Sequence, residues 1–308
     1  MIQDDTGGNM KRYWILAALA TAALTAFGQG APDFSKVEIK TTKHSNNFYT
    51  LDGQGGRIGI LTGPDGVFMV DSQFAPLSEK INNAIKAVSG GAPIKFMINT
   101  HVHGDHTGGD ENFGKMGVTI FSRPQLRNRL AHPNPGPNGQ PGRPMPAAGL
   151  PLVTYTGSLT FNMNGEEVRV IGIPRAHTDG DTIIYFVTND VIMTGDFFRS
   201  VGYPNIDRAN GGSLRGMSDG LARVVALAGP NTKVVPGHGP ITDRAAVMAH
   251  RDVLLGVQRK VSDLVKQGKS ETDTVAAKPA GEFNSRVPEG GPTEDRFVGQ
   301  VFQELKAN

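Results

Sequence analysis

The residues best suited to chemistry are crowded into positions 99–109, which read Asn-Thr-His-Val-His-Gly-Asp-His-Thr-Gly-Gly. Four metal-capable side chains fall within six positions of this stretch: His101, His103, Asp105 and His106. Neutral imidazole and carboxylate are ligands that zinc binds, and thiolate is not required. A single histidine here would be better explained as a solvated loop residue, whereas this compressed pattern indicates a metal site.

The element that must position this motif is segment 94–98, which is apolar, rich in β-formers and preceded by a proline. These features predict a short buried strand that ends just before the motif. His101 and His103 are two positions apart, so in an extended backbone their side chains point the same way. A turn at Gly104 would let Asp105 and His106 approach from another side.

Three further metal-capable residues follow segments that predict strands. The carboxyl ends of strands are where open α/β sheets usually place their sites. These residues are His177 after segment 168–173, Asp196 after 191–194, and His238 after 233–236.

The rest of the chain alternates strand and helix patterns, which predicts an α/β (α+β) fold. Segment 34–72 predicts a β-meander, with strands at 37–42, 48–51, 57–62 and 67–71. Later strands are predicted at 159–163 and 182–187. Helices are predicted over 76–89, after Ser213, over about 243–266 and near 294–305.

Segment 131–151 is rich in proline and glycine and has no periodicity. A stretch of this length without secondary structure is either a functional loop or a disordered insert. We favour a loop near the active site, because loops often carry specificity.

Composition narrows the class of protein. With 308 residues and 38% hydrophobic residues, the chain can form a sizeable core. A net charge of +2 without a long basic run gives no support to nucleic-acid binding. The absence of cysteine excludes disulfides, thiolate ligands and cysteine nucleophiles.

The N-terminal region predicts export. Met10-Lys11-Arg12 precedes an uncharged apolar run that ends in small residues near Gly28, as in a secretory signal peptide. The run is shorter than the roughly 20 residues of a membrane span, so we expect no stable membrane insertion after the signal is removed. We expect residues 1–28 to be upstream sequence plus signal, and 29–308 a single catalytic domain with a C-terminal extension at 270–308. The mature protein would be periplasmic or secreted.

The ordered set His101-x-His103-x-Asp105-His106, His177, Asp196 and His238 resembles the metal-binding motifs of the metallo-β-lactamase superfamily. The resemblance covers nearly all of the mature chain and implies a four-layer αββα sandwich with the site along one edge. It does not fix the substrate, because the superfamily includes β-lactamases, lactonases, thioesterases, nucleases, arylsulfatases and persulfide dioxygenases.

The resemblance also implies a role for each ligand. His101, His103 and His177 would hold one zinc ion, Asp105, His106 and His238 a second, and Asp196 would bridge both. Asp71 matches a family aspartate that orients a ligand; the alternative is that it caps a turn. A metal-bridging hydroxide would attack the carbonyl of a small ester, lactone, thioester or amide, with Asp105 orienting the hydroxide or moving a proton.

Alternatives within the superfamily remain open. β-Lactamases with all-histidine first sites resemble this chain in every ligand except Asp196, because β-lactamases generally lack a bridging aspartate at that place. The shared ligands are His101, His103, Asp105, His106, His177 and His238. A second alternative is a persulfide dioxygenase, which would bind a single iron through His101, His177 and Asp196. The complete second ligand set favours the dinuclear hydrolase.

Several residues near the motifs have two possible roles each. Tyr203 either donates to a substrate oxygen or packs in the core. Arg208 and Asn210 either bind a substrate carboxylate or order their loop. The remaining histidines are read as structural or solvated, with His250 expected on the surface of its helix: His44, His132 and His250.

Overall fold

The computed structural model describes residues 33–136 and 138–307, and the account below concerns the compact unit Phe34–Asn308. The segment read as a signal peptide lies outside the described residues. Among the described residues, no helix has both the length and the apolar character needed to cross a bilayer.

The first sheet holds seven strands in sequence order. Its first four strands form the expected antiparallel meander, whereas β4 to β7 pair in parallel. The strands are β1 (Lys40–Lys43), β2 (Phe48–Asp52), β3 (Ile58–Leu61), β4 (Val67–Val70), β5 (Ile94–Ile98), β6 (Thr119–Ser122) and β7 (Val153–Thr154). The helices that accompany it are α1 (Ser78–Ser89), α2 (Gly104–Thr107), α3 (Asp110–Lys115) and α4 (Pro124–Ala131).

The second sheet has the order β12-β11-β10-β9-β8, with β11 and β12 parallel and the other pairs antiparallel. Its strands are β8 (Ser158–Met163), β9 (Glu166–Gly172), β10 (Thr182–Phe186), β11 (Val191–Gly195) and β12 (Lys233–Pro236). The later helices are α5 (Leu214–Leu227), α6 (Arg244–Lys266), α7 (Glu271–Ala276) and α8 (Glu294–Ala307). Short 3-10 turns lie at Phe34–Lys36, Ala75–Leu77, Ala147–Gly149, Arg208–Asn210 and Gly281–Arg286.

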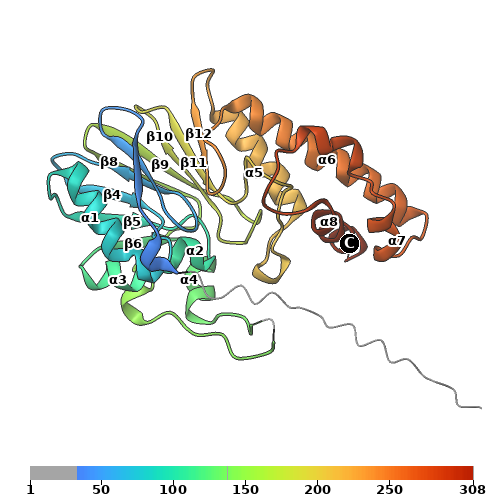
Figure 1. Cartoon of the computed structure of the whole chain (residues 1–308), viewed down its shortest axis with the longest axis horizontal. Coiled ribbons are helices and arrows are strands. Elements are labelled where there is room, and N and C mark those ends of the chain that lie inside the picture. Colours follow the sequence, from blue (N-terminus) through green and yellow to red (C-terminus); the bar gives the residue numbers. More distant parts are fainter. Residues whose placement is uncertain (1–32, 137, 308) are drawn as a thin grey trace, which may run out of the picture. The chain divides into compact units, whose positions relative to one another are not determined.

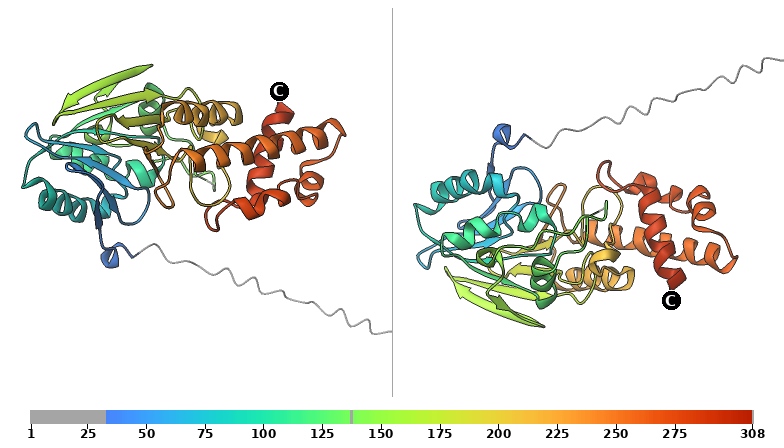
Figure 2. Two further views of the ribbon diagram at one scale, coloured as in Figure 1. Left: turned by 90° about the horizontal axis from the view of Figure 1, so that it is seen from above. Right: turned by 90° about the horizontal axis from the view of Figure 1, so that it is seen from below.

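Three buried clusters show that the elements form four layers, helix, sheet, sheet and helix (Figure 1). On β4, Phe68 and Val70 face the core between the sheets, while Val67 and Met69 face the core under α1. The third core joins the outer face of the second sheet to α5, α6 and α8. Figure 2 shows α6 to α8 reaching beyond the sheets on one side. The expected αββα sandwich is therefore confirmed.

Most predicted elements are present, with differences at their ends. The expected first strand at 37–42 begins only at Lys40, because Lys40 is the first residue that pairs with β2, opposite Asp52. Upstream, the Lys80 ammonium donates to the carbonyl oxygens of Phe34 and Val37 and holds that segment in a turn. Ser213 caps α5 as expected, accepting a hydrogen bond from the Gly216 amide. The strand β7 was not predicted, because two residues are too few to show the alternation of apolar and polar residues that indicates a strand.

Candidate metal centre

The parallel strand pairs bring the metal-capable residues to one edge of the sandwich. Val70 of β4 pairs with Ile98 of β5, so Asp71 lies next to the start of the histidine motif. In the second sheet, Gly195 of β11 pairs with Pro236 of β12, so Asp196 and His238 emerge side by side. Strand ends thus gather residues that are more than 100 positions apart in the sequence.

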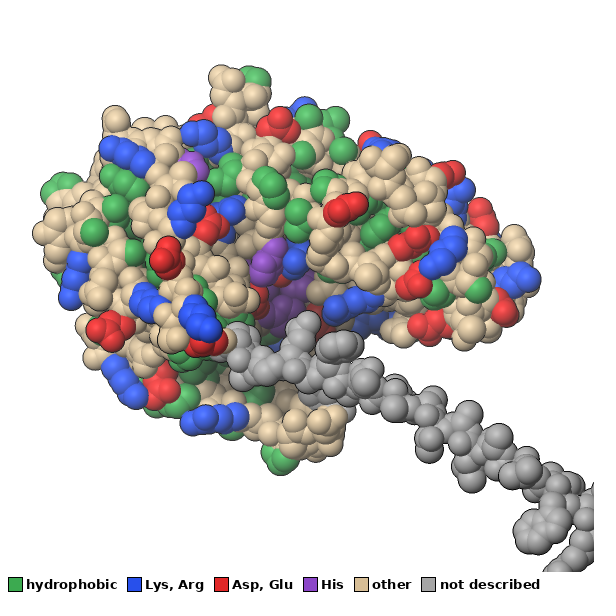
Figure 3. Space-filling view, in the orientation of Figure 1, with side chains coloured by type: hydrophobic (Ala, Val, Ile, Leu, Met, Phe, Trp, Pro, Cys, Tyr) green, Lys and Arg blue, Asp and Glu red, His purple; other side chains and the backbone are tan. Residues whose placement is uncertain are grey.

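The seven predicted ligands fall into two groups. In each group the ligand atoms lie within 4.8 Å of one another, which is close enough to share a single ion. The first group is His101, His103, His177 and Asp196, and the second is Asp105, His106 and His238. Figure 3 shows the histidine side chains gathered in a hollow of the surface.

Asp196 is a member of the first group and also faces the second. Its Oδ1 is 3.3 Å from Nε2 of His106, and its Oδ2 is 3.4 Å from Nε2 of His238. The same Oδ2 is 4.0 Å from Nε2 of His177 in the first group. This is the position that a carboxylate shared by two ions would take.

The donor set fits divalent metals. Nε2 of His101, Nε2 of His106 and Oδ1 of Asp196 are buried and have no hydrogen-bond partner among the described residues. Leaving such atoms buried without a partner is costly, and buried polar atoms normally find one. Imidazole nitrogens and carboxylate oxygens that converge in this way suit zinc or a similar ion.

Hydrogen bonds on the far side of three histidine rings fix which nitrogen is free. Nδ1 of His106 donates to Asp71 Oδ2 at 2.7 Å, and Nδ1 of His177 donates to the carbonyl of Asn205 at 2.7 Å. Both rings therefore keep Nε2 for a metal. His103 is the reverse case, because its Nε2 donates to Asp207 Oδ2 at 2.7 Å while its Nδ1 faces Nε2 of His177 at 2.9 Å, so these two ring nitrogens converge.

The charge states of these groups are set by burial and by one another. Burial lowers the pKa of His177 to about 4 and the pKa of His101 well below its ordinary value, so both rings are neutral and ready to bind metal. At His106, burial opposes protonation, but the carboxylates of Asp71 and Asp196 raise its pKa well above the usual range. A metal that binds Nε2 of His106 must therefore displace a proton.

Two glycines let the backbone approach the site closely. A side chain on Gly237 would place its Cβ 2.1 Å from Oδ1 of Asp196, and one on Gly56 would meet Cε1 of His106 at the same distance. Gly56 lies in the turn between β2 and β3, which is fastened to the motif by its amide donating to the Asp105 carbonyl at 3.0 Å. Neither position has room for a larger residue.

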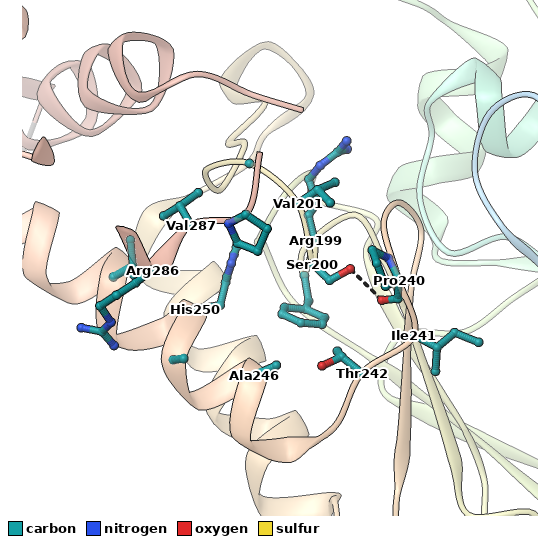
Figure 4. A pocket seen from close by; sticks show the side chains of 15 residues that line it. Arg199, Ser200, Val201, Pro240, Ile241, Thr242, Ala246, His250, Arg286 and Val287 are labelled. Atoms are coloured by element: carbon teal, nitrogen blue, oxygen red, sulfur yellow. Dashed lines mark hydrogen bonds between the residues drawn. The ribbon is translucent and has the colours of Figure 1, made fainter. Parts of the chain in front are cut away.

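The guanidinium of Arg199 is in contact with the ligand cluster. Its Nη1 donates to Asp196 Oδ2 at 2.7 Å, while its Nε is buried without a partner among the described residues. Behind it lies a cavity of about 320 Å³ between the loop that follows Asp196 and α6 (Figure 4). In that view His250 projects from α6 toward Val287.

Two residues that contact the ligands were missed by sequence reasoning. Asp207, which accepts from His103, is separated from it by 104 positions and belongs to no recognisable motif. Arg199 follows Asp196 by three positions, and this spacing alone does not predict a contact. In both cases the contact depends on loop conformation, which has no periodic signal in the sequence.

The structure decides between the alternative roles of residues in the loop after Asp196. Tyr203 is a core residue: its hydroxyl donates to the Ala280 carbonyl at 3.2 Å and its ring stacks on Phe297. Asn210 orders its loop by donating to Asp207 Oδ2 at 2.7 Å, and Arg208 faces a different cavity from the one beside His103.

The expected surface position of His250 is wrong. Its ring packs edge-on against Phe198, and its Nε2 is buried. The side of α6 that carries this ring faces the loop after Asp196, so helical spacing alone placed it on the wrong face. His44 is structural, with Nε2 2.8 Å from the Thr50 hydroxyl, and His132 is exposed, with Nδ1 3.2 Å from Oδ1 of Asn128.

Comparison with known proteins defines the class. The family model for the metallo-beta-lactamase superfamily matches residues 52–238. A metallo-beta-lactamase type 2 from Elizabethkingia meningoseptica is 24% identical over 262 residues, which span 81% of this chain and 97% of the relative. A second, from Pseudomonas aeruginosa, is 23% identical over 65% of this chain and 77% of the relative.

Solved structures show the same fold. A metallo-beta-lactamase from Pontibacter korlensis superposes with a TM-score of 0.59 at 20% identity, covering 71% of this chain and 99% of that structure. A stereoselective inverting sec-alkylsulfatase from a Pseudomonas species gives a TM-score of 0.65 at 14% identity, over 86% of this chain and 50% of the sulfatase.

The chain belongs to the metallo-β-lactamase superfamily. It is a metal-dependent hydrolase of that class, and its ligand cluster is the candidate metal-binding site.

Proposed function

We propose that this protein is an exported dinuclear zinc hydrolase that cleaves a small ester, lactone, thioester or amide. The observation that carries the proposal is the position of Asp196, whose two oxygens lie 3.3 Å from His106 and 3.4 Å from His238 while it also completes the first ligand group. A structural zinc site is closed by four ligands, whereas seven ligands in two groups suit a catalytic pair.

The seven ligands would be divided between two metal ions. His101, His103 and His177 would hold one ion, Asp105, His106 and His238 the other, and Asp196 both. Bound zinc would supply hydroxide at neutral pH by lowering the pKa of water, and would polarise the carbonyl.

Asp105 is the residue suited to orient the attacking group and to hold a proton on its carboxylate. Burial opposes its ionisation, but a hydrogen bond from His238, with Nε2 3.0 Å from Oδ2, lowers the pKa of Asp105 below its ordinary value. Asp105 is therefore ionised at neutral pH. Its side chain is 25% exposed, so it can exchange a proton with solvent at the open side of the site.

Arg199 would hold the substrate beside Asp196. Its guanidinium has five N–H donors. Among the described residues it makes one hydrogen bond to another side chain, the bond to Asp196. The remaining donors suit an anionic group, such as a carboxylate, near the scissile carbonyl.

β-Lactam hydrolysis is the second candidate activity. It is favoured by the relatives, since those from Elizabethkingia meningoseptica and Pseudomonas aeruginosa are both metallo-beta-lactamases type 2. The iron-dependent dioxygenase alternative needs only His101, His177 and Asp196 and leaves the second ligand group without a role.

The test is a substrate panel with the purified, zinc-loaded chain. We expect chelator-sensitive hydrolysis of at least one of a nitrophenyl ester, an acyl-homoserine lactone, a thioester and a chromogenic cephalosporin. Turnover of the cephalosporin would establish the β-lactamase activity. Zinc-loaded protein that hydrolyses none of the four would contradict the proposal.

Export is tested separately. Expressed from its own start in a Gram-negative host, the protein should appear in the periplasmic fraction with a mature N-terminus near residue 29 or 32. Full-length protein in the cytoplasm would contradict export.

A further inference from the structure

A cavity of about 360 Å³ adjoins the first ligand group. His103 and Gly104 of the metal motif line it on one side, and Asp207 lines it where it accepts the hydrogen bond from His103. The opposite wall comes from α4 and the proline-rich segment that follows, with Leu130, Pro133, Asn134, Pro135, Arg143 and Met145. A molecule in this cavity would contact a metal ligand directly.

The proline-rich wall is fastened in place. At one end, the Met145 amide donates to the Leu130 carbonyl at 2.8 Å. Near its middle, Asn134 Nδ2 donates to the Ala209 carbonyl at 2.9 Å and to Asn210 Oδ1 at 3.2 Å. The two arms also pack closely, because a Cβ on Gly142 would lie 2.5 Å from the Asn134 carbonyl oxygen. Prolines reduce the freedom of such a segment further, so little ordering is needed on binding.

The wall is linked to the metal ligand by a chain of hydrogen bonds. Asn210, which accepts from Asn134, donates through Nδ2 to Asp207 Oδ2 at 2.7 Å. The same oxygen accepts from His103 Nε2 at 2.7 Å. The wall of the cavity is therefore connected by hydrogen bonds to the metal ligand His103.

Arg143 is the free charge of this cavity. The other arginine there, Arg129, is held by both oxygens of Asp179, at 2.7 and 2.6 Å. The carboxylate of Asp207 is occupied by His103 and Asn210. Arg143 is exposed, and among the described residues it has neither a hydrogen bond nor an ion pair. The cavity thus offers one unpaired cation beside apolar walls.

We propose that this cavity binds the part of the substrate that carries a carboxylate, with Arg143 as the residue that selects it. Resting on the proposed hydrolase function, this assigns an anionic acyl substrate to the site. The apolar stem would contact Leu130, Pro133 and Met145, and the carbonyl to be cleaved would lie toward His103. Arg199 is a separate cation, bonded to Asp196 Oδ2.

The test compares two esters that differ only in this charge: mono-4-nitrophenyl glutarate and its methyl ester. For R143Q we expect KM for the anionic ester to rise about tenfold, the loss of one charge-assisted hydrogen bond, with kcat little changed. The methyl ester should be unaffected. R223Q is the matched control, since Arg223 is an exposed arginine on α5 outside the cavity.

Binding of glutarate to the zinc-loaded protein, measured by calorimetry, separates this inference from the proposed function. R143Q should bind glutarate several-fold more weakly than the wild type, and R223Q should bind it equally well. Equal binding by R143Q and wild type, or equal KM changes for the two esters, would overturn the role of Arg143. If the wild type cleaves neither ester but still binds glutarate more tightly than R143Q, the result would count against the proposed hydrolysis of such esters and not against the role of Arg143.

Discussion

Asp71 and His106 are joined by a 2.7 Å hydrogen bond from Nδ1 to Oδ2, although 35 positions separate them. The same carboxylate accepts the Thr100 amide and the Thr100 hydroxyl, each at 2.7 Å. Asp71 adopts a left-handed backbone with a φ of 62° to do so. A residue other than glycine holds this conformation only where its surroundings enforce it, so the aspartate fixes both the start of the metal motif and one ligand ring.

Replacing Asp71 by alanine should weaken the second metal site. His106 would lose the acceptor that fixes its tautomer, and removal of such a partner typically lowers metal affinity by about 10- to 100-fold. Zinc affinity measured by competition with a chelating indicator checks this, with Asp219→Asn on the exposed face of α5 as the control. Unchanged affinity for both zinc ions would show that Asp71 only caps its turn.

Replacing Asp207 by alanine should affect the other site. Here His103 loses its acceptor, so the first ion should bind about 10- to 100-fold more weakly while the second is held normally. Stepwise zinc titration of D71A and D207A side by side distinguishes the two sites. If both variants lose the same ion, the division of ligands into two groups is wrong.

These two aspartates also show what sequence reasoning can reach. Asp71 could be predicted through the family resemblance, which implies a ligand-orienting aspartate at the end of the strand at 67–71, and the parallel pair β4–β5 brings it to His106. Asp207 lies in a loop without periodicity, and its contact with His103 arises only when the loop after Asp196 folds back. Patterns of apolar residues predicted most strands, and the family resemblance implied the four layers, but neither carries information on the conformation of a particular loop.

Gly237→Ala should damage the site without touching a ligand. The new methyl group would lie 2.1 Å from Asp196 Oδ1 and 2.9 Å from His106 Cε1. We expect loss of at least one zinc equivalent and a drop in the free energy of unfolding of about 1–3 kcal/mol, as for an overpacked core. The control is Gly157→Ala, where a Cβ meets nothing within 4 Å. Wild-type zinc content in G237A would contradict the close approach.

His250 predicts a specific pH dependence of stability. Burial, followed by the charge of Arg199, lowers the pKa of His250 from 6.5 to about 4. Between these values the unfolded chain binds the proton and the folded chain does not, so stability falls as pH drops from 6.5 to 4.

The variant His250→Phe, which keeps a ring against Phe198, should lose this dependence. Urea unfolding of both metal-free proteins measures it. The advantage of the variant over the wild type should grow by roughly 2 kcal/mol between pH 7 and pH 4.5. Parallel stability curves over this range would show that His250 titrates normally.

The most direct test of the whole account is the metal content of the purified chain, measured together with hydrolysis. We predict two zinc ions per chain in the wild type, and the loss of both turnover and at least one zinc ion when Asp196 is replaced by alanine, because this residue faces both ligand groups. A single iron per chain, with full metal content in D196A, would contradict the dinuclear hydrolase.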